Sequence, residues 1–183
     1  MSADRESSNA RGAQVRHRNE RISKPRGMQM NWVMQFEILG EVALAMLLGG
    51  VIGFEREMAD KPAGFRTQML VAGASALLVG LADAMLLRYI VEGKANITAD
   101  PIRITEAIVT GISFLGAGTI FRRDSSEQVQ GLTTAASILL CAAVGISVAL
   151  RQFALAVGVT LLALVVLRGL TGVENRLNGK KKA

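Results

Sequence analysis

The sequence feature that most constrains the fold is a set of long apolar runs separated by short polar connectors. Five runs occupy about residues 36–54, 69–91, 104–121, 132–150 and 153–170. Each approaches the roughly 20 apolar residues that an α-helix needs to cross a bilayer core. The runs lack apolar–polar alternation, which favours helices over barrel strands. We therefore expect an all-α, polytopic transmembrane bundle of five helices, with successive helices antiparallel.

The segments outside these runs are polar. Residues 1–35 are rich in Arg, Ser, Asn and Gln, so we expect a disordered tail, and they lack the apolar segment of a signal peptide. Residues 171–183 form a basic C-terminal tail that ends in three lysines before Ala183. Anionic lipid attracts such a tail, so the net charge of +6 calls for no nucleic-acid partner.

Enzymatic activity is not expected from the motifs of this chain. The sequence shows no nucleophilic side chain paired with a general base, no phosphate-binding loop, and no CxxC or HExxH motif. The single histidine, His17, lies in the polar tail and has no second histidine with which to share a zinc ion. The single cysteine, Cys141, lies within a span and cannot form an intramolecular disulfide.

The distribution of Lys and Arg bears on the orientation of the bundle. Eleven of these residues fall on the N-terminal side of the membrane and ten on the other side. Seven of the eleven precede Met28, so translation from Met28, Met30 or Met34 would leave four against ten. On that hypothesis the N-terminus lies outside and the C-terminus in the cytoplasm of a bacterial inner-membrane protein.

A shift of 67 residues superposes two parts of the chain. Leu48-Gly49 then falls on Leu115-Gly116, and Gly64 falls on Gly131. Two repeated helical hairpins followed by a fifth helix would produce this match. The alternative is that two hairpins of one bundle use the same small residues because they face the same packing problem.

A charged turn between the first two runs is the first candidate functional site. Pro62 and Gly64 give the turn a defined shape, and ionic residues gather around them at the membrane surface. It could be a solvated surface, a gate or a docking face for another membrane protein. The expected cluster comprises Glu55, Arg56, Glu57, Pro62, Gly64, Arg66, Thr67 and Arg123, with Glu55 and Arg56 able to pair with Arg66 and Arg123.

Small residues recur in every span. Helices in lipid associate through close backbone approach and through interhelical hydrogen bonds, so we expect packing or gating roles for these positions. The run Gly116-Ala117-Gly118 also weakens a helix and could allow a break. The candidates are Gly49, Gly50, Gly53, Gly116, Gly118, Gly131, Thr133 and Thr134, with Ser137 as a further hydrogen-bonding residue.

Three carboxylates are candidate metal ligands at the opposite surface. Asp83 lies within the second span, where burial of its charge favours an interior position with a partner or a cation. Glu41 and Glu106 begin the first and third spans on the same side of the membrane. Together the three could form an acidic mouth for Mg²⁺, which commonly takes one or two carboxylates and keeps several waters. Alternatively, Asp83 pairs with Arg88 and the glutamates are simply hydrated.

Three motifs in order give this chain a resemblance to a known family. They are Ile52-Gly53-Phe54-Glu55-Arg56-Glu57 with Lys61-Pro62-Ala63-Gly64-Phe65-Arg66-Thr67, then Gly111 to Ile120, then Val129 to Ile138. Residues from about 36 to 150 closely resemble the MgtC/SapB family. The resemblance implies an inner-membrane protein associated with growth at low magnesium and, in pathogens, with survival inside macrophages.

The family resemblance also implies a mode of action. Members are linked to modulation of ATPases and membrane potential more firmly than to magnesium movement. We therefore expect a non-enzymatic protein of magnesium or ion homeostasis that modulates another membrane protein, such as an ATPase or transporter. The alternative is a magnesium transporter or channel that uses Asp83, Glu41 and Glu106. A small homo-oligomeric scaffold without ion coupling is the third possibility.

Overall fold

The computed structural model describes residues 32–91, 101–122 and 129–179. Five helices make up most of this part of the chain: α2 (Trp32–Met58), α3 (Phe65–Val91), α4 (Pro101–Ala117), α5 (Leu132–Ala149) and α6 (Phe153–Gly179). The predicted five-helix, all-α architecture is therefore confirmed. The two-residue strands β1 (Phe121–Arg122) and β2 (Val129–Gln130) pair antiparallel between α4 and α5. The predicted disordered tail falls mostly outside the described residues, and so do the three terminal lysines.

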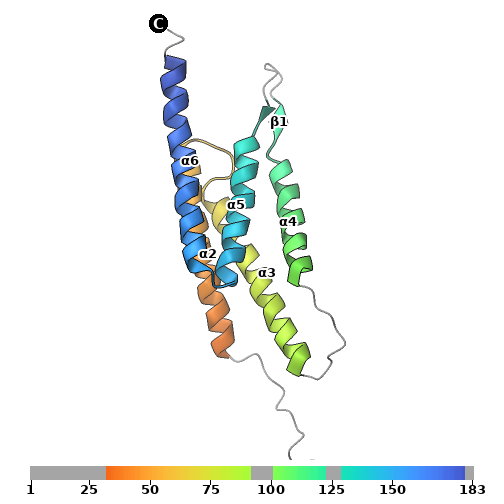
Figure 1. Cartoon of the computed structure of the whole chain (residues 1–183). Helices are drawn as coiled ribbons and strands as arrows, with labels where there is room; N and C mark the ends of the chain where they lie inside the picture. The colour runs from red at the N-terminus through yellow and green to blue at the C-terminus, as the bar shows by residue number, and fades with distance from the viewer. Residues whose placement is uncertain (1–31, 92–100, 123–128, 180–183) are drawn as a thin grey trace, which may run out of the picture.

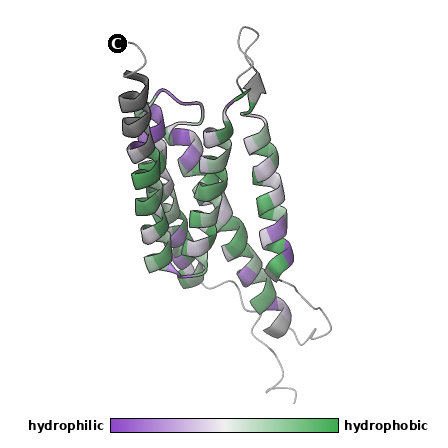
Figure 2. Ribbon diagram, turned by 45° about the horizontal axis from the view of Figure 1, so that its top comes forward, coloured by the Kyte–Doolittle hydropathy of each residue, from purple (hydrophilic) through white to green (hydrophobic). Residues whose placement is uncertain are grey.

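Three of the described helices are long and apolar enough to cross a membrane. They are α2, the Phe65–Tyr89 part of α3, and α5. The apolar part of α6, Phe153–Gly169, is shorter, and α4 has 17 residues. Figure 2 shows apolar residues along the shafts of the helices and hydrophilic residues gathered toward their ends. That distribution is typical of helices that pass through lipid.

The bundle is arranged around α3 and α5. Helix α3 packs against α2 and α5, while α6 packs against α2 and α5 and α4 packs against α5 and α3. The α2–α3 turn, the β1–β2 pair and the C-terminal end of α6 all lie at one end of the bundle, at the top of Figure 1. The α5–α6 turn and the start of α2 lie toward the opposite end.

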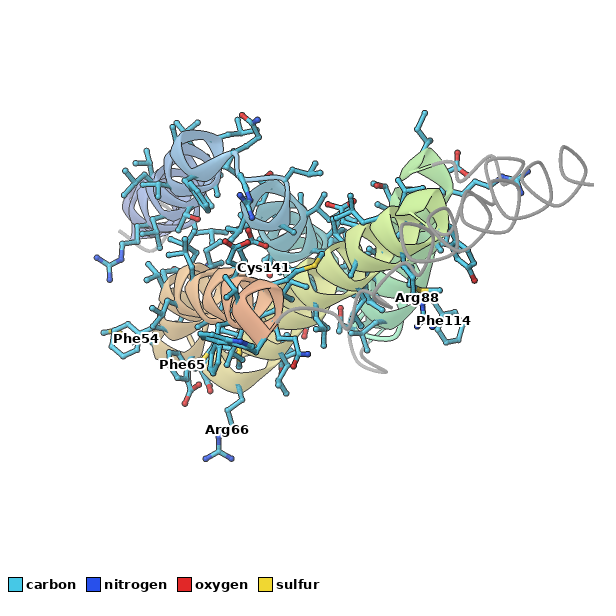
Figure 3. All side chains as sticks on the ribbon, turned by 90° about the horizontal axis from the view of Figure 1, so that it is seen from below. Phe54, Phe65, Arg66, Arg88, Phe114 and Cys141 are labelled. Carbon is cyan, nitrogen blue, oxygen red and sulfur yellow. The ribbon has the colours of Figure 1, made fainter. Side chains whose placement is uncertain are left out.

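The core is built from small side chains. Ala45, Ala72 and Ala142 are fully buried, and Ala76 is nearly so. Cys141 is buried among them, near the centre of the bundle in Figure 3. Small residues let helix backbones approach closely, which matters in lipid because apolar helices gain little by leaving it.

Large apolar side chains cover the outside of the bundle. Phe114 of α4 is 84% exposed and points away from the other helices (Figure 3). A soluble protein rarely exposes so many large apolar residues, whereas lipid solvates them at no cost.

Helix α4 ends earlier than the apolar run predicts. The run continues to residue 121, but the helix stops at Ala117 because Gly118 and Thr119 form a turn. The Thr119 N–H donates to Gly116 O at 2.9 Å, and the Thr119 hydroxyl donates to the same oxygen at 2.7 Å. The turn directs the chain into β1, so the pair of glycines coincides with a helix end.

Candidate functional site

A buried polar cluster lies in the bundle next to the α2–α3 turn. Its side chains come from the end of α2, the start of α3 and the start of α5, and none is more than 6% exposed. We call it the turn cluster, and its members are Glu55, Arg56, Gln68, Thr134 and Ser137. Buried polar groups are costly unless they are paired, so their pairing defines the site.

Glu55 and Arg56 form a buried ion pair. Arg56 Nε donates to Glu55 Oε2 at 2.7 Å, and Arg56 Nη2 donates to Glu55 Oε1 at 3.0 Å. The two carboxylate oxygens are thus held by one guanidinium in a two-pronged arrangement. The pair is formed by adjacent residues of one helix rather than across the hairpins with Arg66, as the sequence had led us to expect. Arg66 points away from the bundle (Figure 3), and Arg123 lies outside the described residues.

Gln68 connects α3 to α5. Its Nε2 donates to Ser137 Oγ at 2.8 Å and to Ala63 O at 3.4 Å, and Ser137 Oγ donates in turn to Thr134 O at 2.8 Å. Gln68 Oε1 is the buried side-chain atom without a hydrogen-bond partner in the part of the chain that the structure describes. Sequence reasoning identified Ser137 and Thr134 but missed Gln68, because Gln68 directly precedes the run that begins at residue 69.

Substituting alanine for Ser137 is expected to destabilise the bundle by about 1–3 kcal/mol, because a buried Gln68 N–H would lose its short acceptor. Ser147→Ala in the same helix is the matched control, since the Ser147 hydroxyl donates to Ala143 O of its own helix. Thermal unfolding in detergent measures both variants. Equal midpoints for the two would contradict the interhelical role of Ser137.

The α2–α3 turn has a fixed shape. Phe65 N–H, at the start of α3, donates to Glu57 Oε2 at 2.9 Å. Asp60 and Ala63 adopt left-handed backbone conformations, with φ of 53° and 56°. The left-handed conformations of the turn thus occur at Asp60 and Ala63 and not at Gly64. Gly64 instead lies against the Glu57 side chain. Pro62 is exposed and Thr67 is half-buried.

The glycines of α2 allow its close contact with α3. A Cβ on Gly49 would lie 2.6 Å from Gln68 O, and one on Gly53 would lie 2.8 Å from Phe65 Cα. A Cβ on Gly50 would lie 3.0 Å from Met69 Cγ. These three positions thus pack against α3, which supports the packing role in preference to gating.

The small residues predicted in α4, in α5 and between these helices differ in how closely they pack against their neighbours. A Cβ on Gly116 would meet Ala135 at 3.5 Å, an ordinary van der Waals distance, and Gly118 is exposed. Gly131 has a φ of 92° and lies against the Thr119 carbonyl at the base of the β1–β2 pair. Of the two adjacent threonines, Thr133 is exposed and Thr134 is buried. The proposed hairpin repeat stays a prediction.

The opposite end of the bundle holds the predicted acidic residues. Arg151, in the α5–α6 turn, donates to Glu41 Oε1 at 3.1 Å and to Glu37 Oε2 at 3.0 Å. The hydrogen bond to Glu37 and the charges of both glutamates raise the pKa of Arg151. Glu41 therefore shares with Glu37 an arginine that lies 110 positions away from it in the sequence.

The structure does not bring Asp83, Glu41 and Glu106 together. Across the described ranges, no three His, Cys, Asp or Glu residues are placed to hold a metal ion. Glu106 is exposed on α4, and Asp83 is exposed rather than turned into the bundle interior. Asp83 does line a cavity of about 650 Å³ that Glu37, Glu41 and Arg151 also line. Glu37, Glu41 and Asp83 thus share one cavity with Arg151, whereas Glu106 does not line it, and the predicted magnesium site stays a prediction.

The comparisons with known proteins agree with this architecture. Residues 42–176 match the sequence description of the MgtC family. The chain is 35% identical over 120 residues to "Protein SapB" of Bacillus subtilis, covering 66% of this chain and 50% of that one. It is 35% identical over 152 residues to the "Putative magnesium transporter YhiD" of Escherichia coli, covering 80% and 66%. It is 44% identical over 105 residues to "Protein MgtC" of Brucella abortus, covering 57% and 39%.

The matched segment accounts for about half to two thirds of the first two of these relatives and less than half of the third. No solved structure matches this chain. The apolar helical bundle and these relatives define a polytopic α-helical membrane protein. The chain belongs to the MgtC family, which is not a family of enzymes.

Proposed function

We propose that this protein serves magnesium homeostasis in the bacterial inner membrane by binding and modulating another membrane protein, such as an ATPase. Membership of the MgtC family supports the link to magnesium, as does the name of the Escherichia coli relative. The pairing of Glu37 and Glu41 with Arg151 supports modulation over magnesium transport, because these carboxylates already have a cationic partner. On this proposal the N-terminus lies outside and the α2–α3 turn faces the cytoplasm.

The α2–α3 turn is the proposed contact with the partner. It is the single feature that carries the proposal, because this charged and exposed segment is held at one end by a buried ion pair and at the other by the hydrogen bond of Glu57. Lys61 and Pro62 are exposed, while the Glu57 carboxylate fixes the start of α3 and the Glu55–Arg56 pair fixes the end of α2. A preorganised surface loses little conformational entropy when a partner binds.

Site-specific crosslinking tests this contact. A photoreactive residue at Lys61 is expected to crosslink one membrane protein in cells grown at low magnesium, and the same residue at Phe114 serves as an exposed control on α4. The partner is then identified by mass spectrometry, and its ATPase activity is measured with the wild-type protein and with Lys61→Glu. Crosslinks to lipid alone, or an unchanged ATPase activity, would overturn the proposal.

The second candidate function is cation transport, which the cavity shared by Glu37, Glu41 and Asp83 favours. If the protein is a modulator, Asp83→Asn is expected to leave growth at low magnesium within about twofold of wild type, because an exposed side chain contributes little to folding. Glu106→Gln is the matched control. Proteoliposome flux measures transport directly: magnesium uptake that Asp83→Asn abolishes and Glu106→Gln spares would establish the transporter.

A further inference from the structure

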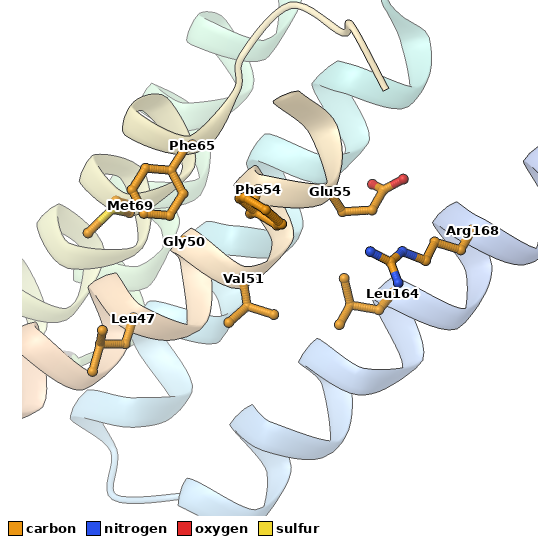
Figure 4. Close-up of a pocket in the computed structure, with 9 residues that line it drawn as sticks. All are labelled: Leu47, Gly50, Val51, Phe54, Glu55, Phe65, Met69, Leu164 and Arg168. Atoms are coloured by element: carbon orange, nitrogen blue, oxygen red, sulfur yellow. The ribbon is translucent and has the colours of Figure 1, made fainter. Parts of the chain in front are cut away.

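A cavity of about 330 Å³ lies on the outer face of α2, where Gly50 leaves the helix without a side chain. Figure 4 shows α3 on one side of this face and α6 on the other. Apolar side chains from the three helices line it: Leu47, Val51 and Phe54 of α2, Phe65 and Met69 of α3, and Leu164 of α6. Leu47 and Phe54 are more than half exposed, so the cavity opens outward, toward lipid. We call it the α2 groove.

The α2 groove is apolar at one end and charged at the other. Glu55 and Arg168 point toward one another beside its apolar lining (Figure 4). Glu55 lies three residues before the end of α2, about one helical turn from the charged α2–α3 turn that we place at the membrane surface. Leu47 precedes Glu55 by eight residues, which places it about 12 Å deeper along the helix axis. The groove therefore spans from the headgroup level into the hydrocarbon.

The charges at the upper end do not cancel. Both carboxylate oxygens of Glu55 are already bound by Arg56, so this pair is neutral. Among the side chains that the structure describes, none forms a hydrogen bond or an ion pair with Arg168. The α2 groove therefore carries one net positive charge at the level where lipid phosphates lie, and a guanidinium matches a phosphate with two parallel hydrogen bonds.

We propose that the α2 groove binds an anionic glycerophospholipid, with its phosphate on Arg168 and an acyl chain along Leu47 and Val51. An anionic headgroup fits better than a zwitterionic one because the latter brings a second positive charge to Arg168. This binding goes beyond the function proposed above and does not depend on the identity of the ion or the protein partner.

Lipid retention tests the charged end. Wild-type protein, Arg168→Gln and Arg66→Gln are delipidated in neutral detergent and titrated with phosphatidylglycerol or phosphatidylcholine of the same acyl chains. Arg66→Gln removes an equal charge at the same end but outside the groove. We expect Arg168→Gln to weaken phosphatidylglycerol binding about fivefold, the factor for one arginine near anionic lipid, and Arg66→Gln to leave it unchanged. Native mass spectrometry counts the lipids retained.

A second, independent test fills the apolar end of the α2 groove with a larger side chain. Val51→Trp is expected to reduce retention of both lipids, while Val157→Trp on the exposed face of α6 has no effect. Sodium phosphate at equal ionic strength is expected to leave the thermal midpoint unchanged. Equal binding of the two lipids to wild type, equal losses in both arginine variants, or stabilisation by inorganic phosphate alone would overturn the proposal. A change of oligomeric state in Val51→Trp without loss of lipid would assign the groove to a second copy instead.

Discussion

Substituting alanine for Gly145 is expected to destabilise the bundle by about 1–3 kcal/mol or more, through overpacking between α3 and α5. An added Cβ would meet the Ala72 carbonyl oxygen inside any permitted contact distance, and would lie 3.1 Å from Ala72 Cα. These atoms belong to a helix backbone and not to the flexible end of a side chain, so the two helices must separate. Thermal unfolding in detergent and the yield of monodisperse protein measure the effect.

Gly111→Ala is the matched control for Gly145→Ala. Nothing lies within 4 Å of a Cβ at Gly111, which is also in a helix. Alanine favours helix over glycine by about 1 kcal/mol, so this variant should be unchanged or slightly more stable in the same assay. If Gly145→Ala behaved like Gly111→Ala, the close approach of α5 to α3 at this point would be wrong.

The contrast between these glycines shows what the sequence could and could not predict. The length and apolarity of the runs predict five helices, because lipid leaves the backbone no other way to satisfy its own hydrogen bonds. Every span contains glycine, but composition does not say which glycine touches a neighbour. Gly145 lies against Ala72, whereas Gly111 and Gly158 have nothing near them. That difference depends on how the helices rotate about their axes.

At the candidate site, too, the sequence predicted the residues but not their contacts. Glu55, Arg56 and Glu57 were identified because charge beside an apolar run is conspicuous, and all three act at the turn. Their partners were not identified, because pairing depends on side-chain direction. The contact of Arg151 with Glu37 joins positions 114 residues apart, and no local pattern indicates it. For Asp83 the sequence left two positions open, one inside the bundle and one near the membrane surface beside Arg88, and the structure places its side chain in an exposed position.

Replacing Arg56 with leucine is expected to have the largest effect among the charged residues, about 3–5 kcal/mol of destabilisation, because it leaves Glu55 as a buried charge without its partner. Arg56 and Glu55 are 2% and 6% exposed, so water cannot take over the lost hydrogen bonds. Thermal unfolding in detergent again provides the measurement. Arg66→Leu, at the same end of the bundle but exposed, should change the midpoint little.

The double variant Glu55→Gln/Arg56→Leu separates loss of pairing from loss of packing. Removal of the carboxylate charge should restore part of the stability lost in Arg56→Leu, because the remaining amide costs less to bury than an unpaired carboxylate. A cycle of the two single variants and the double variant then gives the coupling between the residues. If the double variant were as unstable as the sum of the single ones, the ion pair would not hold the end of α2. The rigidity on which we base the partner-binding turn would then need another source, and Glu57, which binds the start of α3, would be the next residue to test.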